Sequence, residues 1–443
     1  MNCLHVPRMM MPLEGTDLYK WSVIACDQYT SQPEYWKETE HNVGDAPSTL
    51  RLTLPEVYLG EDGEAKRVED IHRTMEQYLQ EGILQELPAG FMLVRRNFGK
   101  QCSRWGLVAE IDLETYDYKK DAYSLIRPTE MTVEERIPPR LRVRQTASVE
   151  LPHIMLMIDD PERAIIEPLV DRRDEFRRIY GTDLMQEGGY VEGWLIPEGK
   201  DTEFVIRQAE RLADPAVFRK KYDLDREYPL LNFAVGDGNH SMATAKAAWE
   251  NIKAGLSEEQ RSNHPARYCL CEIVNVHDES IEVEPIHRVV FQADTDELLA
   301  EAKTYYEKAG CRMSVEEYSG KDSRGAETEE AHCFTLCSAG GWKTIKVINP
   351  KWGIAVATLQ SFLDDYLTHH EQSRIDYIHG SDVVESLGTK EGNLGFFLPE
   401  IRKEDLFIGV IKDGVLPRKT FSIGEANEKR YYMECKRIRP TDN

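Results

Sequence analysis

The chain has 443 residues, of which 41% are hydrophobic, and this length exceeds one ordinary domain, so we expect two or three lobes. Its 78 acidic residues outnumber 55 basic ones, and the formal charge of −23 indicates a soluble protein whose field repels nucleic acid and anionic membranes. Because no apolar stretch approaches the roughly 20 residues that span a bilayer, and no signal peptide is visible, we expect a cytoplasmic protein.

Nine cysteines occur at irregular spacing, and this odd number in a long chain favours reduced thiols over a disulfide framework. Cys269 and Cys271 would share one face of a strand, but no second pair of Cys or His ligands accompanies them. Cys333 and Cys337 also lack such a pair. We therefore expect small buried thiols and no metal site at these positions.

The first predicted lobe, residues 1–150, combines strands and helices. Residues 21–26 form an apolar segment that predicts a strand, and the polar residues 27–31 predict a loop before a helix that carries Tyr35 and Trp36. Helical spacing from 71 to 87 and apolar runs at 90–95 and 106–112 complete an α/β pattern.

The densest basic segment covers residues 125–144. Arg140, Arg142 and Arg144 alternate, so in an extended backbone their guanidinium groups would share one face suited to phosphate or carboxylate. The alternative is ordinary salt bridges to the many glutamates, and it is the more common outcome for any single arginine. Arg127 and Glu130 stand in a loop stiffened by prolines, a usual location for functional side chains.

The second predicted lobe, residues 151–295, contains a strand at 153–158 and helical regions at 167–180 and 203–213. It closes with strands at 272–276 and 281–291. Near its end, His287 and Arg288 could donate hydrogen bonds to a phosphate, although His287 could equally be a buried core histidine.

The most informative segment of this lobe is the turn from Gly236 to Ser241. The apolar run 230–235 predicts a strand, and the alanine-rich segment after the turn predicts a helix beginning near residue 241 or 242. Unpaired N–H groups at the start of a helix form an anion site, and Gly236 and Gly238 permit positive φ. The side chains of Asn239, His240 and Ser241 add donors.

A simpler interpretation of the turn is that Asn239 or Ser241 caps the helix while the glycines only reverse the chain. The spacing fits neither a Walker loop nor a dinucleotide-binding fingerprint. The third predicted lobe, residues 296–443, has an exposed loop at 318–330 and strands near residues 333, 344, 396 and 407–411. Its proline-stiffened turn near Lys419 offers a cation for phosphate.

Four separated motifs occur in a characteristic order: Arg127 to Glu130, Asp237 to His240, Pro285 to Arg288 and Pro417 to Lys419. Together they resemble the bacterial and archaeal family called domain of unknown function 1015. The turn also resembles the phosphate-handling motif of the ParB/sulfiredoxin superfamily, which includes nucleotide-dependent partition proteins, sulfiredoxins and kinases of free serine. The resemblance implies an α/β (α+β) mixed-sheet, multi-lobe protein containing a ParB/sulfiredoxin-like core.

The turn departs from the family pattern at two positions. Asn239 replaces a histidine, and Ser241 replaces an arginine that would bind phosphate with two hydrogen bonds. Arg288, Lys419 or the arginines at 140–144 could supply the missing cation. The exchange also suits a small donor such as pyrophosphate, since the sequence has no evident adenine pocket.

The resemblance implies a phosphotransferase that acts on a small hydroxylated metabolite, with free L-serine as the best candidate and ATP, ADP or pyrophosphate as donor. Mg²⁺ is the expected metal. The catalytic residues it implies are Asp237, His240 and Glu130. The phosphate-binding residues it implies are Gly236, Gly238, Asn239, Ser241, Arg127, His287, Arg288 and Lys419.

Two other functions stay open. The first is a nucleotide-responsive switch like the partition proteins, without DNA binding because the chain is acidic and lacks a recognisable helix-turn-helix. The second is a sulfiredoxin-like redox enzyme, which ranks last because Cys269 and Cys271 are the nearest cysteines to the turn in sequence. In every case we expect a small-molecule ligand and no nucleic acid or membrane partner, with oligomerisation left open.

Overall fold

The chain forms two units, and the second is inserted into the first. The computed structural model describes residues 3–99, 103–119, 122–224, 226–318, 330–378, 380–417 and 419–440. Unit 1 comprises Met1–Glu282 and Gly424–Asn443, and unit 2 comprises Val283–Ile423. Strands β13 (Val283–Pro285) and β20 (Phe421–Ile423) begin and end unit 2, and they pair with each other in antiparallel fashion.

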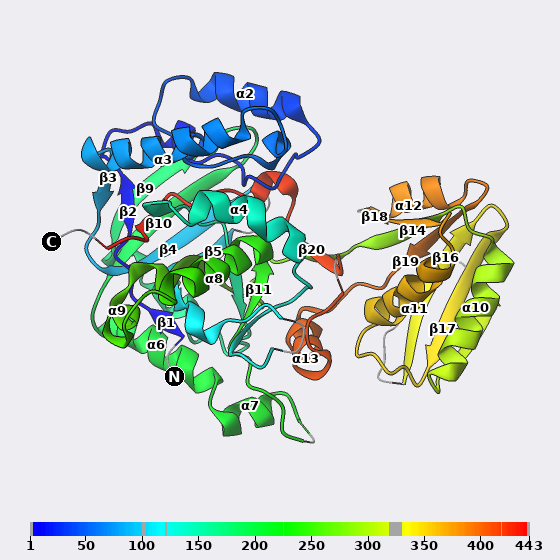
Figure 1. Cartoon of the computed structure of the whole chain (residues 1–443). Helices are drawn as coiled ribbons and strands as arrows, with labels where there is room; N and C mark the ends of the chain where they lie inside the picture. The colour runs from blue at the N-terminus through cyan, green and yellow to red at the C-terminus, as the bar shows by residue number, and fades with distance from the viewer. Residues whose placement is uncertain are drawn as a thin grey trace. The chain divides into compact units, whose positions relative to one another are not determined.

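A mixed sheet organises unit 1 (Figure 1). Strand β11 pairs in parallel with β6 and in antiparallel fashion with β8, which in turn runs parallel to β12. The remaining neighbours are antiparallel. Among the described residues the sheet has nine strands, in the order β6 (Ile126–Pro128), β11 (Phe233–Asp237), β8 (Met155–Ile158), β12 (Tyr268–Asn275), β5 (Arg104–Asp112), β4 (Gly90–Asn97), β10 (Tyr190–Pro197) and β9 (Arg177–Asp183), with β1 (Leu4–His5) beside β5.

The helices of unit 1 and two short strand pairs complete its fold. One pair is β2 (Met10–Pro12) with β3 (Leu84–Glu86), and the other is β7 (Val149–Glu150) with β21 (Lys436–Arg437). The helices are α1 (Leu18–Trp21), α2 (Pro33–Val43), α3 (Glu64–Gln80), α4 (Ile137–Arg144), α5 (Glu167–Asp171), α6 (Lys200–Leu212), α7 (Pro215–Lys221), α8 (Asn239–Lys253) and α9 (Glu258–Asn263).

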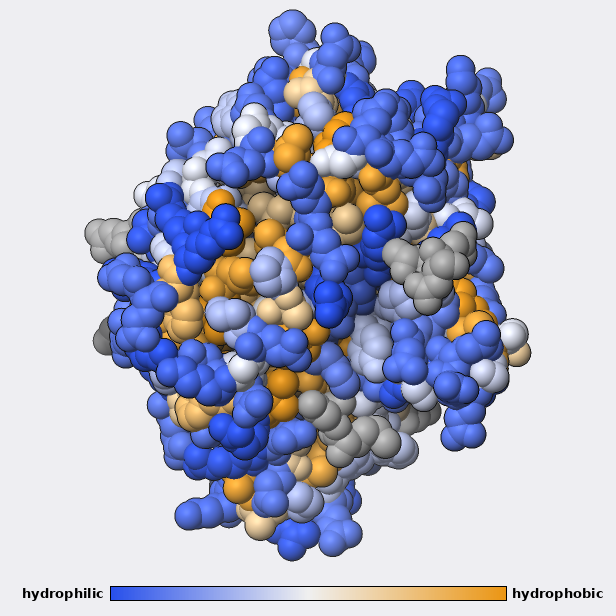
Figure 2. Space-filling view, turned by 90° about the vertical axis from the view of Figure 1, so that its left-hand side faces the viewer, coloured by the Kyte–Doolittle hydropathy of each residue, from blue (hydrophilic) through white to orange (hydrophobic). Residues whose placement is uncertain are grey.

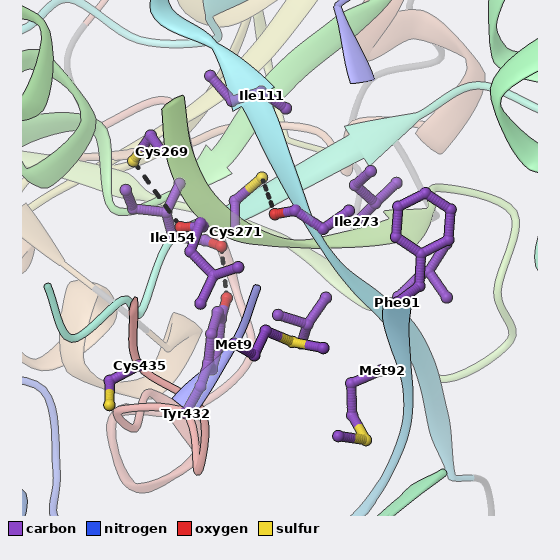
Figure 3. Packing of buried hydrophobic residues seen from close by; sticks show 14 of the residues in the cluster. Met9, Phe91, Met92, Ile111, Ile154, Cys269, Cys271, Ile273, Tyr432 and Cys435 are labelled. Carbon is purple, nitrogen blue, oxygen red and sulfur yellow. Dashed lines mark hydrogen bonds between the residues drawn. The ribbon is translucent and has the colours of Figure 1, made fainter. Parts of the chain in front are cut away.

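The core of unit 1 is built from the apolar runs of its central strands. Phe91, Met92, Cys271 and Ile273 are almost completely buried, and Cys271 donates a weak hydrogen bond from Sγ to the Ala109 carbonyl (Figure 3). Burial also raises the pKa of the Cys271 thiol. The described thiols are free of disulfides, as the sequence predicts.

Unit 2 is an antiparallel sheet with helices on both faces. In β14, Arg288 bonds to Gln360 of α11 on one face, while its neighbour Val289 packs with Val384 of α12 on the other. Among the described residues the sheet order is β15 (Arg312–Glu317), β17 (Gly341–Ile348), β16 (Ala331–Ser338), β19 (Asn393–Phe397), β14 (His287–Phe291) and β18 (Arg374–Ile378), and the helices are α10 (Thr295–Lys308), α11 (Ala355–His369), α12 (Ser381–Gly388) and α13 (Lys403–Asp413).

The fold confirms a mixed α/β protein and corrects several local predictions. Residues 140–144 lie in helix α4 and not in an extended segment, and residues 407–411 lie in α13 and not in a strand. The expected helix at 167–180 ends at Asp171 and gives way to β9. Most of the expected loop at 318–330, residues 319–329, lies outside the described residues.

The two units differ from the lobes 1–150, 151–295 and 296–443 expected from the sequence. The reason is strand pairing, because β5 and β12 come from the first two expected lobes and lie side by side in one sheet. The last residues of the chain also return to unit 1 through β21.

The visible face of the molecule in Figure 2 is mostly hydrophilic, with hydrophobic residues gathered in patches between the charged ones, in keeping with the composition. Within the described ranges, no helix combines the length and apolar character that crossing a bilayer requires.

Candidate phosphate site

The turn after β11 is tighter than the sequence suggests. Strand β11 continues to Asp237, with a shift of register against β8 between Val235 and Asp237, and α8 begins at Asn239. Gly238 alone joins them, with φ of +81°. A Cβ at this position would lie 2.9 Å from Ile154 Cα, so only glycine fits. The positive φ expected at Gly236 is not found.

The first turn of α8 carries no side-chain cap and no acidic residue. Asn239 and Ser241 lie inside the helix, so the interpretation that either one caps it is wrong. The Asn239 Oδ1 atom is buried and has no hydrogen-bond partner. Because the first N–H groups of a helix have no intrahelical acceptor, this end of α8 retains its capacity to bind an anion.

The segment after Arg127 meets the turn, because β6 pairs in parallel with β11. Thr129 donates from its hydroxyl to the Val235 carbonyl at 2.7 Å, and the Val133 N–H donates to His240 Nε2 at 3.2 Å. Two motifs about 100 residues apart in sequence are therefore adjacent.

The guanidinium of Arg127 forms hydrogen bonds with backbone carbonyl groups. Its guanidinium donates to the Pro229 carbonyl at 3.3 Å and is 2% exposed, and burial lowers its pKa to about 10. These hydrogen bonds lead to the segment before β11 and not to the turn, so the role of Arg127 as a phosphate ligand remains a prediction.

A lysine from the end of the chain lies beside the turn. Lys429 Nζ lies 3.4 Å from Asp237 Oδ1, and the Lys429 carbonyl accepts from the Ala25 N–H at 2.8 Å. Burial would lower the pKa of Lys429, but the carboxylates of Asp237, Asp27 and Glu130 outweigh it and raise the pKa. The side chain is therefore a firmly charged cation among three carboxylates.

Asp27 and Arg140 form a second charged layer. Arg140 donates from Nε to Glu56 Oε1 at 2.8 Å, and its Nη2 lies 3.4 Å from Asp27 Oδ2. Burial would raise the pKa of Asp27, but its interactions with His153, Arg140 and Lys429 lower it, so the carboxylate stays ionised. Arg140 is a candidate from the sequence, whereas Asp27, Glu56 and His153 were not recognised there as site residues.

Ser241 faces a buried histidine. Its Oγ lies 3.0 Å from His153 Nε2, and His153 is 7% exposed. Burial lowers the pKa of His153 despite the neighbouring Asp27, so the imidazole is neutral at neutral pH. The His153 Nδ1 atom is buried and has no hydrogen-bond partner.

A cavity of about 120 Å³ adjoins this pair of residues. The rest of its wall is mainly apolar, and its polar lining comprises Thr53, Glu56, Arg140, Arg144, Glu150, His153, Ser241 and Thr244. The apolar lining comes chiefly from Leu52, Leu54, Leu59, Met75, Val143, Ala147, Val149, Leu151 and Ile154. The start of α8, the side chain of Arg140 and a partly open cavity therefore lie together in unit 1.

Two thiols also line this cavity, Cys26 and Cys269. The sequence had indicated Cys269 and Cys271 as the nearest, and Cys26 is a further one. Burial, aided by Asp27, raises the pKa of Cys26 to about 12, so its thiol is protonated at neutral pH. A thiolate nucleophile is therefore disfavoured here.

Three predicted phosphate ligands belong to unit 2. His287 is buried, and its Nδ1 accepts from the Leu398 N–H at 3.2 Å. Arg288 is fully buried and donates from Nε to Gln360 Oε1 at 3.0 Å, whereas Lys419 is exposed with φ of +58°. The role of these three residues in phosphate binding stays a prediction.

Carboxylates suited to a hard cation stand at the turn. Within the described ranges, the group of three side chains close enough to share one metal ion is Glu297, Glu301 and His370 of unit 2, and no such group lies at the turn. Mg²⁺ commonly needs only one or two carboxylates because donor phosphates and water complete its shell. Asp237 and Glu130 fit that requirement.

The chain has distant similarity to several solved structures. No curated protein matches the chain. A free serine kinase in complex with AMP is 12% identical, with 75% of this chain and 91% of that chain covered at a TM-score of 0.37. SbnI from Staphylococcus aureus, truncated at its C-terminus, is 8% identical, with 72% and 82% covered at 0.34.

A conserved hypothetical protein from Pyrococcus furiosus is 12% identical, with 72% of this chain and 90% of that chain covered at a TM-score of 0.35. Similarity at these levels transfers no activity to this chain. A family model, by contrast, identifies the family of the chain. It matches residues 10–366 and is described as a protein of unknown function, DUF1015. The chain belongs to the DUF1015 family.

Proposed function

We propose that the protein is a phosphotransferase that moves a phosphoryl group from ATP, ADP or pyrophosphate to a small hydroxylated metabolite, with free L-serine as the preferred candidate. The observation that carries this proposal is the uncapped start of α8, which lies beside Lys429. Phosphoryl transfer needs positioning and neutralisation of the phosphate oxygens, and this arrangement supplies both.

The residues of the site would have three roles. The N–H groups of Asn239, His240 and Ser241 would hold the transferred phosphate at the positive end of the helix dipole. Lys429 would balance its negative charge. Asp237 or Glu130 would accept the proton of the acceptor hydroxyl as it attacks phosphorus.

A ParB/sulfiredoxin-like core is part of this proposal. Support comes from the strand, glycine turn and helix of residues 233–253, and from the parallel strand β6 that brings Glu130 to the same edge. Mg²⁺ would be held by Asp237 and Glu130, where it would neutralise donor phosphate oxygens.

Arg140 could supply the positive charge of the arginine that the turn lacks. Its Nη1 atom is buried without a hydrogen-bond partner, and its side chain lines the cavity that Ser241 also lines. Arg140 therefore supports the expectation that an arginine of the 140–144 segment supplies the cation. Arg142 and Arg144 instead pair with Glu64 and Glu150.

The direct test is to incubate the full chain with L-serine and Mg²⁺, to offer ATP, ADP or pyrophosphate in turn, and to measure O-phosphoserine by mass spectrometry. We expect product with at least one donor. Nucleotide hydrolysis without product would favour the switch function, and no product with any donor would remove L-serine as the acceptor.

A variant pair links any activity to the turn. We expect His240→Ala to lower turnover at least tenfold, because His240 joins the start of α8 to the loop at Val133. The matched control is His264→Ala, since His264 in unit 1 accepts a local backbone hydrogen bond from Ala266 and packs against Trp249 near the other end of α8. Unchanged turnover in His240→Ala would remove the turn from the mechanism.

A further inference from the structure

Ser241 and His153 form a pair with the geometry of a nucleophile and its base. The 3.0 Å separation of Oγ and Nε2 is hydrogen-bond distance, and both residues line the cavity beside α8. We propose that Ser241 is a nucleophile that takes the phosphoryl group from the donor as a covalent phosphoserine, with His153 as its base. This inference rests on the proposed phosphotransferase function.

The surroundings of His153 suit a base. The residue is 7% exposed, and its ring packs edge-on against Tyr431 with ring centroids 5.1 Å apart, so its position is fixed. Burial lowers the pKa of the imidazole, which leaves Nε2 able to accept a proton at neutral pH. Asp27 Oδ2 lies 4.0 Å from Nε2 and would stabilise the imidazolium that forms.

The surroundings of Ser241 suit a phosphorylated side chain. It is the third residue of α8, in the first turn, where N–H groups and the helix dipole stabilise a phosphate. The buried Arg140 Nη1 on the same cavity has no hydrogen-bond partner and can donate to a phosphate oxygen.

The first step forms and breaks one bond at phosphorus. Ser241 Oγ attacks the terminal phosphorus of the donor, its proton moves to His153 Nε2, and the bond from phosphorus to the bridging oxygen breaks. The leaving group is inorganic phosphate when pyrophosphate is the donor and ADP when ATP is the donor.

The second step returns the enzyme to its starting state. The acceptor hydroxyl attacks the phosphoserine phosphorus and gives its proton to the Asp237 carboxylate, which releases it to solvent. The bond between phosphorus and Ser241 Oγ breaks, and Oγ recovers the proton held on His153 Nε2. No oxidant, reductant or further reactant is required.

The test separates covalent transfer from direct transfer. The full chain is incubated without an acceptor, either with pyrophosphate and ³²P-labelled phosphate or with ATP and ¹⁴C-labelled ADP. A covalent intermediate predicts exchange of label into the donor and a phosphate group on the peptide containing Ser241. Direct transfer to the acceptor predicts neither.

Variants assign the signals. Ser241→Ala should abolish exchange and peptide phosphorylation, and His153→Gln should slow exchange at least a hundredfold because its amide cannot take up the proton. Ser262→Ala is the control, since the Ser262 hydroxyl only bonds to the Glu258 carbonyl of its own helix α9. Circular dichroism and melting temperature would verify that each variant is folded.

The outcomes distinguish this inference from the proposed function. Phosphorylation of L-serine with no exchange and no labelled Ser241 would overturn the covalent step and leave the phosphotransferase function intact. Full turnover by Ser241→Ala would do the same. Labelled Ser241 without any product from L-serine would support the covalent step and change the acceptor, whereas absence of exchange, label and product would overturn both proposals.

Discussion

Lys429 Nζ lies 3.4 Å from Asp237 Oδ1, although 191 residues separate the two positions in sequence. The contact joins the segment that follows unit 2 to the strand that leads into α8. Because Asp27 and Glu130 also raise the pKa of Lys429, three carboxylates stabilise its ammonium group. The charge of the site therefore depends on this side chain.

Lys429→Met should weaken donor binding. Removing a charge-assisted contact costs about 1.5–3 kcal/mol, so the Kd for pyrophosphate should rise at least tenfold, measured by isothermal titration calorimetry. Lys253→Met is a matched control, because Lys253 also pairs with two carboxylates, Glu114 and Glu250, but at the other end of α8. Equal affinities in the two variants would contradict a role for Lys429 in the site.

Gly238→Ala should lower the melting temperature of unit 1. Positive φ costs a non-glycine residue roughly 1–2 kcal/mol, and the added Cβ would also meet Ile154 Cα at 2.9 Å. Gly82→Ala tests the first effect alone, because Gly82 has φ of +69° and nothing within 4 Å of an added Cβ. Differential scanning calorimetry should show the larger decrease for Gly238→Ala.

Arg140→Met should destabilise unit 1 far more than Arg142→Met on the same helix. Arg140 forms ion pairs with Glu56 and Asp27, and its side chain is 10% exposed. Breaking such a buried ion pair costs roughly 3–5 kcal/mol of folding free energy. Arg142 pairs with Glu64 while 54% exposed, so its loss should cost at most about 1 kcal/mol. Denaturant unfolding followed by tryptophan fluorescence would compare them, and similar midpoints would contradict the assignment.

Glu434→Gln should stabilise the protein at pH 8 and change little at pH 4.5. Burial raises the pKa of Glu434 from 4.5 to about 7, so the folded state holds a proton that the unfolded state has released. The resulting loss of free energy of unfolding is absent below pH 4.5, grows as the pH rises to 7 and reaches about 3 kcal/mol above pH 7. Melting temperatures of both proteins across this range would verify the sign, and a constant difference would contradict it.

The local part of the site was predictable because its signals are local. An apolar run, two glycines and an alanine-rich segment indicate strand, turn and helix without reference to the rest of the chain, and the structure has them at 233–253. The proximity of Glu130 was predictable from family resemblance alone. Parallel pairing of β6 with β11 supplies its physical cause.

The missed residues depend on contacts between distant segments. Asp27 directly follows an apolar segment, as Asp237 does, and this shared pattern was the one signal available in the sequence. His153 reaches Ser241 across 88 positions, and Lys429 arrives only after unit 2, so no spacing rule identifies them.

Two local errors have a common origin in short ambiguous patterns. Alternating arginines at 140–144 fit an extended strand, but Pro138 in the first turn sets φ for a helix. The apolar run 407–411 is short enough to suit either strand or helix, and its packing in unit 2 selects α13.

The inserted position of unit 2 controls when the site can exist during synthesis. A ribosome makes β11 and the start of α8 early, then all of unit 2, and only afterwards the segment that carries Lys429. A nascent chain therefore holds an excess of carboxylates at the turn and lacks the balancing cation. Donor binding should begin only once the closing segment has docked, so incomplete chains would not sequester the phosphoryl donor.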